Sequence, residues 1–279
     1  MYISATGSLT AKERDPIIYR GAYAEIARQI HEDGFSAVEM HILDSKEIDR
    51  EELWRSLREN GLSLSSIGTG SIYGKKHLNL ADQSMPVRDK AIEHLRQHMI
   101  TAQPDHALVI VGIMAGRASD AGSIEAYKDN LTNSLYRLDR LAEEMDVCLG
   151  LEIMGRWDSD WLFNMSRAKA YFTEQSFHRI SMHIDTFYMN VEEDDMAASI
   201  RDCRGLIGHV HIADNNRWYP GHGHINFREI LQALSDIQYK GALAMEIFQF
   251  PDSRTAGRKG REYLQRIIEA FGEKEPFSV

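Results

Sequence analysis

The chain has 279 residues, with 32 Lys and Arg against 42 Asp and Glu, so its net charge is −10 with histidine neutral. Such an acidic balance argues against nucleic-acid binding, because phosphate backbones attract basic surfaces. The content of 43% hydrophobic and 27% charged residues is typical of a globular protein with a sizeable core and excludes a disordered chain.

The sequence shows no pattern typical of a membrane span, a signal peptide or a cysteine-based metal site. No run approaches the roughly 18 apolar residues of a membrane span, and the first residues lack the basic and apolar pattern of a signal peptide. We therefore expect a soluble, cytoplasmic protein with no membrane partner. Cys148 and Cys203 lie far apart and form no structural-zinc motif, so we expect both to be buried and reduced.

Short apolar runs rich in β-forming residues alternate with helical patterns along the chain. Eight strands are predicted, at residues 2–5, 37–43, 62–68, 107–113, 148–154, 180–186, 207–213 and 242–248. Between them, apolar residues recur every three or four positions, which gives each helix one apolar face. The clearest case comprises Leu131, Leu135, Leu138, Ala142 and Met145. Before four of the strands lie glycines expected to be left-handed, namely Gly34, Gly61, Gly205 and Gly241.

Eight strands alternating with helices predict an α/β fold, a (β/α)8 TIM barrel, as a single domain over residues 1–279. A doubly wound open sheet is the alternative. It is disfavoured because no G-x-G-x-x-G motif follows the first strand and the segment IGTGSIYG lacks the ending of a phosphate-binding loop.

Four residues of metal-ligating type stand at the ends of the last four predicted strands: Glu152, Asp185, His211 and Glu246. In a barrel these ends meet at the face that carries the active site. Any one of them alone could simply cap a helix, but three carboxylates buried together without a cation would cost several kcal/mol. The oxygen-rich set suits a six-coordinate divalent ion, with Mn²⁺ expected and Mg²⁺ or Co²⁺ as alternatives.

Such a site predicts proton transfer next to a carbonyl group. A divalent ion chelated by a carbonyl and its neighbouring hydroxyl stabilises an enediolate. Glu152 and Glu246 would approach from opposite sides, one removing a proton and the other returning it to the opposite face. Arg217 could hold substrate oxygens or be an exposed loop residue, and Tyr188 could donate its hydroxyl or pack on the rim. His209 is expected to be a hydrogen-bonded core histidine.

The segments LEIM, HIDTFYMNVEE, GHVHIADNNRWYPGHGHINF and AMEIF, with IGTG after the third strand, resemble the xylose isomerase-like barrel superfamily, and within it the ketose 3-epimerases (the D-tagatose/D-psicose 3-epimerases and 5-keto-gluconate epimerases). The resemblance implies a carbohydrate epimerase that inverts C3 of a ketose or keto sugar acid. It makes Glu152, Asp185, His211 and Glu246 the metal ligands, Glu152 and Glu246 the acid/base pair, and Arg217 a substrate-orienting group.

The sequence departs from the family pattern at two positions, and the resemblance implies one further property. Asp158 stands where the family usually has glutamate, and Tyr188 where it has histidine, so both are candidate substrate-binding residues in an altered pocket. Family barrels are commonly dimers or tetramers, which makes a homo-oligomer the expected assembly around a small-molecule sugar substrate.

Three other functions compete with C3 epimerisation. Aldose–ketose isomerisation would use the same metal site and return the proton to another carbon. A DNA-repair endonuclease on the same barrel would need more metal ligands and a basic groove, which the net charge of −10 disfavours. A non-catalytic sugar-binding protein would have no need of two opposed glutamates.

Overall fold

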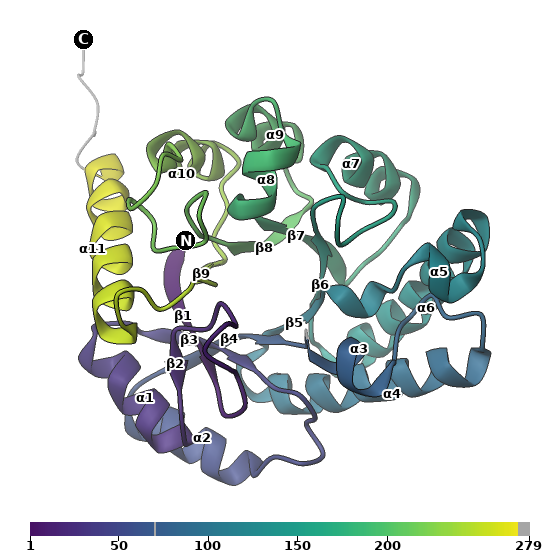
Figure 1. Cartoon of the computed structure of the whole chain (residues 1–279), viewed down its shortest axis with the longest axis horizontal. Coiled ribbons are helices and arrows are strands. Elements are labelled where there is room, and N and C mark those ends of the chain that lie inside the picture. The colour runs from purple at the N-terminus through teal and green to yellow at the C-terminus, as the bar shows by residue number, and fades with distance from the viewer. Residues whose placement is uncertain (70, 273–279) are drawn as a thin grey trace.

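In the computed structural model, which describes residues 1–69 and 71–272, eight parallel strands form a closed barrel. The last barrel strand pairs with the first, and Figure 1 looks onto this ring with the helices around it. The barrel strands are β1 (Tyr2–Ser8), β3 (Ala37–His41), β4 (Ser63–Gly68), β5 (Leu108–Val111), β6 (Leu149–Ile153), β7 (Ile180–Asp185), β8 (Ile207–His211) and β9 (Ala242–Met245). The predicted TIM barrel is confirmed, and the described residues form one domain. Residue 70 and residues 273–279 of the predicted range lie outside the described part.

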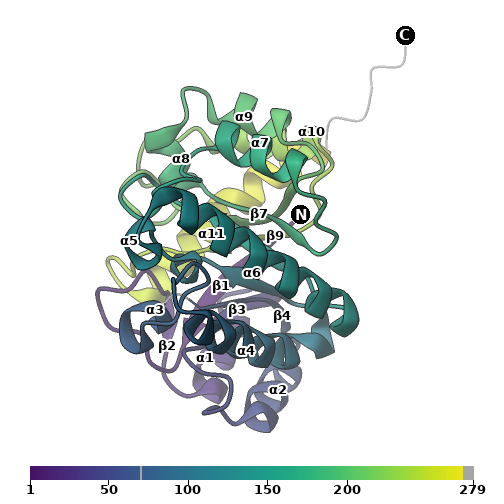
Figure 2. The same ribbon diagram turned by 90° about the vertical axis from the view of Figure 1, so that its right-hand side faces the viewer.

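Helices follow the strands in the expected alternation. They are α1 (Tyr23–Glu32), α2 (Arg50–Glu59), α3 (Ser71–Lys76), α4 (Met85–Ala102), α5 (Ala118–Ala121), α6 (Ile124–Met145), α7 (Met165–Glu174), α8 (Thr186–Glu192), α9 (Met196–Asp202), α10 (Phe227–Asp236) and α11 (Ser253–Gly272), with short 3-10 turns η1 (Gln103–Asp105) and η2 (Ile113–Ala115). Figure 2 shows α4 and α6 side by side on the outside of the barrel.

The predicted apolar face of α6 is confirmed, since Leu131, Leu135, Leu138 and Ala142 are buried and Met145 is partly buried. The side chain of Ser123 caps the first turn of α6 by accepting a hydrogen bond from the backbone N–H of Ala126. One polar cap and one apolar stripe thus fix where this helix begins and which side it turns toward the barrel.

Two details of the chain path differ from the sequence expectation. A short extra strand, β2 (Tyr19–Arg20), pairs with the end of β1, and two residues are too few to show a periodic pattern. Gly34, Gly61 and Gly205 have the expected positive φ, but the expectation for Gly241 was wrong. There the left-handed residue is Gln238, with φ of 61°, two residues after the end of α10.

The expectation for the cysteines holds only in part. Cys203 is buried, but Cys148 is exposed at the residue before β6, and both are free thiols. Among the described residues, no helix is both long and apolar enough to cross a bilayer.

A buried histidine pair fixes the loop after β3. His98 on α4 is fully buried, and its Nδ1 lies 2.5 Å from the hydroxyl of Ser45. Its Nε2 lies 3.1 Å from Nε2 of His94, and this nitrogen of His94 also lies 3.0 Å from the carbonyl of Leu43. Burial, helped by the nearby His94, lowers the pKa of His98 to about 3.

This depressed pKa predicts a specific acid sensitivity of folding. Below a pH of about 6.5 the unfolded chain protonates His98 while the folded chain does not, so the free energy of unfolding falls with pH, by up to about 1.4 kcal/mol per pH unit. We expect His98→Gln to lose about 2 kcal/mol less than the parent protein between pH 6.5 and 5. Urea denaturation at both pH values measures this, with the exposed His31→Gln as control. An equal loss in both variants would contradict the prediction.

Candidate active site and metal centre

A cavity of about 350 Å³ opens at the carboxyl ends of the barrel strands. Residues at or after the ends of β6 to β9 line one part of it, namely Glu152, Met154, Asp158, Tyr188, His211, Arg217 and Glu246. Residues at or after the ends of β1, β3, β4 and β5 line the rest, among them the apolar Pro16, Ile17, Ile42, Leu43 and Ile113 and the polar Thr10, Asp15, His41 and Thr69.

The four residues predicted as metal ligands come together at the floor of this cavity. Ligand atoms of Glu152, Asp185 and His211 all lie within 4.8 Å of one another. Glu246 follows β9 directly, one residue beyond the strand, and its Oε2 lies 3.6 Å from Nδ1 of His211. Glu246 therefore adjoins the compact group of three.

Local backbone structure explains why two of these side chains point inward. Asp185 ends β7 and accepts a hydrogen bond of 2.9 Å from the backbone N–H of Phe187, which caps α8 and fixes the carboxylate. Glu152 reaches the floor past Gly112, where a Cβ would lie only 2.5 Å from Oε2 of Glu152. A glycine at position 112 thus provides the space that this carboxylate occupies.

The electrostatics of the floor set the two glutamates apart. Burial raises the pKa of Glu152 to about 8, where the charges of Glu246 and Asp185 add to the shift and that of His211 opposes it. Burial also raises the pKa of Asp185. Burial alone would raise the pKa of Glu246, but the charges of Arg217 and His211 hold it below its usual value. One glutamate is therefore shifted toward an acid and the other toward a base.

Arg217 lies among the proposed ligands rather than on the rim. Its Nη2 donates to Oδ2 of Asp185 at 3.1 Å and to the carboxylate of Glu246. Its guanidinium also stacks over the rings of Phe187, at 4.8 Å, and Tyr188, at 5.4 Å. The residue has a φ of 59°, and its backbone N–H donates to the carbonyl of Asp214. The loop thus directs the guanidinium of Arg217 toward the carboxylates of Asp185 and Glu246.

Asp158 and Tyr188 are brought together at the cavity wall. The Tyr188 hydroxyl donates to Oδ2 of Asp158 at 2.9 Å, and Nη2 of Arg117 lies 3.3 Å from Oδ1 of the same carboxylate. Arg117 also donates to the backbone carbonyl of Trp157 at 2.9 Å. The two residues that depart from the family pattern thus form one hydrogen-bonded group, with a third member that sequence reasoning missed.

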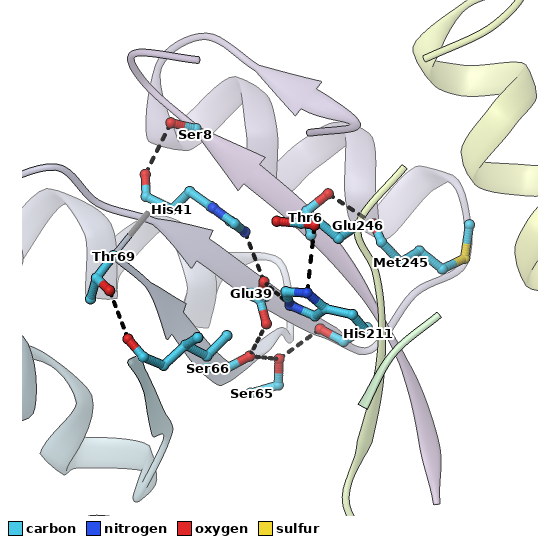
Figure 3. A network of polar contacts seen from close by, with 12 residues as sticks. Thr6, Ser8, Glu39, His41, Ser65, Ser66, Thr69, His211, Met245 and Glu246 are labelled. Atoms are coloured by element: carbon cyan, nitrogen blue, oxygen red, sulfur yellow. Dashed lines mark hydrogen bonds and ion pairs between the residues drawn. The ribbon is translucent and has the colours of Figure 1, made fainter. Parts of the chain in front are cut away.

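Sequence reasoning also missed a buried carboxylate beneath the floor. Glu39 on β3 is fully buried, and Figure 3 shows it between His41 and His211. Burial alone would raise its pKa, but His211 and hydrogen bonds from His209, His211 and His41 hold the pKa well below its usual value. His209 lies 2.8 Å from Oε2 of Glu39, which confirms it as a hydrogen-bonded core histidine. The available signal was one acidic residue inside the apolar run AVEMH.

The donor set fits a divalent cation. Nδ1 of His211 is buried and has no hydrogen-bond partner among the described residues. It lies beside a group of carboxylates in which burial raises the pKa of Glu152 and of Asp185, so an added positive charge would stabilise their ionised forms. A bound dication would supply that charge and would use the free imidazole nitrogen.

Comparison with known proteins agrees with this fold. A family model described as xylose isomerase-like TIM barrel matches residues 27–267. The chain is 30% identical over 235 residues to L-ribulose 3-epimerase of Mesorhizobium japonicum, covering 81% of this chain and 77% of that protein. It is 31% identical over 124 residues to 3-dehydro-D-guloside 4-epimerase of Escherichia coli, covering 44% and 47% respectively.

A solved structure is similar over nearly the full length. The crystal structure of D-psicose 3-epimerase in the presence of D-fructose matches with a TM-score of 0.82 at 20% identity, covering 96% of this chain and 99% of that chain. This likeness concerns the fold alone. Because the family model spans most of the sequence and a relative aligns over most of both proteins, the chain belongs to the xylose isomerase-like TIM barrel family.

Proposed function

We propose that this protein is a Mn²⁺-dependent epimerase that inverts C3 of a ketose or keto sugar acid. The observation that carries the proposal is the pair Glu152 and Glu246, which share one cavity with pKa values shifted in opposite directions. A two-base inversion requires one group that gives a proton and one that takes it. The relatives, which include L-ribulose 3-epimerase, support the same reaction class.

Glu152, Asp185, His211 and Glu246 would hold the metal. When bound, the ion supplies a positive charge that polarises the substrate carbonyl and acidifies the neighbouring C–H bond. The three carboxylates and one imidazole suit Mn²⁺, with Mg²⁺ or Co²⁺ able to take the same oxygen-rich position.

The two glutamates move the proton. Glu246, ionised because Arg217 and His211 lie beside it, removes the C3 proton from one face of the substrate. Glu152 gives a proton to the opposite face, which inverts the carbon. Since both directions of the reaction occur, each glutamate must serve as acid in one direction and as base in the other.

Arg217 and the wall residues hold the sugar. Nη2 of Arg217 lies between Asp185 and Glu246, where it can donate to a substrate oxygen next to the reacting carbon. Asp158 presents a carboxylate and Tyr188 a hydroxyl to the same cavity. These polar groups orient the substrate, while apolar residues of the cavity such as Ile17, Ile42 and Ile113 exclude water from the reaction.

The test is proton exchange followed by NMR. The Mn²⁺-loaded protein is incubated in D2O with a panel of ketopentoses, ketohexoses, keto sugar acids and 3-keto-glycosides. Deuterium at C3 together with a new C3 diastereomer supports the proposal. Deuterium at C1 or C2 with aldose formation would identify an aldose–ketose isomerase instead, and a protein that binds these sugars without exchange would be a sugar-binding protein.

A second candidate is inversion at C4 of a 3-keto-glycoside. It is favoured by the 31% identity to 3-dehydro-D-guloside 4-epimerase of Escherichia coli and by the altered pair Asp158 and Tyr188. The proton at C4 of a 3-ketone is as close to the carbonyl as the C3 proton of a 2-ketone, so the same residues can act. Deuterium at C4 of the 3-keto-glycoside in the same experiment distinguishes this function.

The hydrogen bond between Tyr188 and Asp158 at the cavity wall gives a second prediction. We expect Tyr188→Phe to raise KM about fivefold with a smaller change in kcat, because one hydrogen bond of about 1 kcal/mol in the substrate wall is lost and Asp158 is left less well fixed. Steady-state kinetics measures this. Tyr136→Phe removes a hydroxyl from the exposed face of α6 and serves as control. An unchanged KM would show that Tyr188 only packs on the rim.

We propose further that the protein is a homo-oligomer, a dimer or tetramer. The support is the resemblance to a family whose barrels commonly assemble in this way. Light scattering coupled to size-exclusion chromatography gives the mass directly.

A further inference from the structure

Glu39 receives hydrogen bonds from four side chains that come from three strands. On Oε1 it accepts from Nε2 of His41 at 2.8 Å and from Nε2 of His211 at 2.9 Å. On Oε2 it accepts from Nε2 of His209 at 2.8 Å and from the hydroxyl of Ser66 at 2.6 Å. Figure 3 shows Glu39 with three of these partners, His41, His211 and Ser66.

These contacts fix which ring nitrogen each histidine can offer to other partners. An ionised carboxylate only accepts hydrogen bonds, so each imidazole must carry its proton on Nε2. A histidine binds a metal ion as the neutral imidazole, and a neutral ring that donates from Nε2 has its lone pair on Nδ1. For His211 this nitrogen is buried, has no partner among the described residues and lies 3.6 Å from Oε2 of Glu246.

We propose that Glu39 is a positioning residue of the metal centre, which holds His211 in the orientation and tautomer that present Nδ1 to the cation. This inference rests on the proposed function, because it takes His211 as a metal ligand. Carboxylates that accept from the second nitrogen of a ligating histidine orient the ring and make it a better ligand. Glu39 has this geometry toward His211.

The same carboxylate ties the metal centre to the cavity wall. His41 follows the same strand by two residues, lines the cavity and is bound through Nε2 to the oxygen that also holds His211. The imidazoles of His41 and His211 lie nearly parallel, with ring centroids 6.5 Å apart. Glu39 therefore sets the relative position of one proposed ligand and one wall residue, although its own side chain does not line the cavity.

The test measures Mn²⁺ affinity, which a purely structural role of Glu39 would not change. Glu39→Gln keeps the size of the side chain but removes its charge and turns one acceptor into a donor. We expect its Kd for Mn²⁺, followed by the EPR signal of free Mn²⁺, to rise between about 10- and 100-fold. Ser65→Ala is the matched control, because Ser65 is buried beside Ser66 but bonds to neither Glu39 nor a histidine.

A second variant keeps the test decisive if Glu39→Gln folds poorly. Glu39→Asp retains the charge with a shorter reach, and we expect a smaller rise in Kd than for glutamine. Thermal unfolding of each metal-free variant reports any loss of folding separately. A lowered Tm with an unchanged Kd in either variant would overturn the inference and leave the proposed function intact. Failure of the parent protein to bind Mn²⁺ would overturn the proposed metal-dependent function and the inference together.

Discussion

Replacing Glu152 or Glu246 by glutamine is expected to lower kcat for epimerisation by about 10³-fold, since proton transfer by a positioned side chain contributes between about 10² and 10⁴. Both carboxylates line the cavity, and the two-base mechanism assigns each of them to one face of the substrate. Because both are also proposed ligands, the assay must be run at saturating Mn²⁺, with Kd for the ion measured for each variant. Glu143→Gln, an exposed change on α6, is the control.

The isotope pattern tests the assignment of each glutamate more sharply than the rate does. In Glu152→Gln the remaining base, Glu246, can still remove a proton from one epimer and return deuterium to the same face. That epimer should therefore exchange without inverting, while the other epimer should not exchange. Glu246→Gln should show the reverse selectivity. Equal exchange of both epimers by either variant would exclude the two-base mechanism.

Removal of the metal is expected to abolish turnover and to lower Tm. A cation that binds only the folded state stabilises it by about 2.7 kcal/mol at a concentration of 100 Kd, which for a domain of this size raises Tm by roughly 5 °C or more. The reason lies in Glu152, Asp185 and Glu246, whose ionised forms are otherwise stabilised mainly by the nearby charges of His211 and Arg217. Activity and thermal unfolding are measured after chelation and again after adding Mn²⁺, Mg²⁺ or Co²⁺.

Asp185→Asn is the matched variant for this experiment. Its amide keeps the hydrogen bond to the N–H of Phe187 but removes one charge from the ligand group. We expect its Tm to respond much less to Mn²⁺ than that of the parent protein. Full activity of the chelated parent, with no response of Tm to any of the three ions, would contradict the metal-dependent mechanism.

The barrel was predictable because each main strand is a compact apolar run and each long helix has one apolar face. The ends of the last four strands then located Glu152, Asp185, His211 and Glu246, since topology alone brings strand ends to one face. Their roles remain predictions, but the structure places all four together. The strand β2 was missed because its pairing depends on the turn of the preceding loop rather than on a pattern.

The site residues that could not be predicted from the sequence contact partners that are far from them along the chain. Glu39 is 172 residues away from His211 in the chain, so no local spacing indicates that the two side chains bond. Arg117 reaches Asp158 across 41 residues and one strand, β6. Such contacts depend on how loops and layers of the closed barrel meet, which the periodicity of a single strand does not encode.

The two sides of the cavity come from different parts of the chain. The proposed ligands and acid/base groups stand at the ends of β6 to β9, whereas the loops after β1, β3 and β5 supply most of the apolar lining. Substitutions in these early loops would therefore reshape the space for the far end of a substrate without replacing a reacting group. Part of the substrate preference can thus change through the first half of the chain while the residues proposed to carry the reaction stay the same.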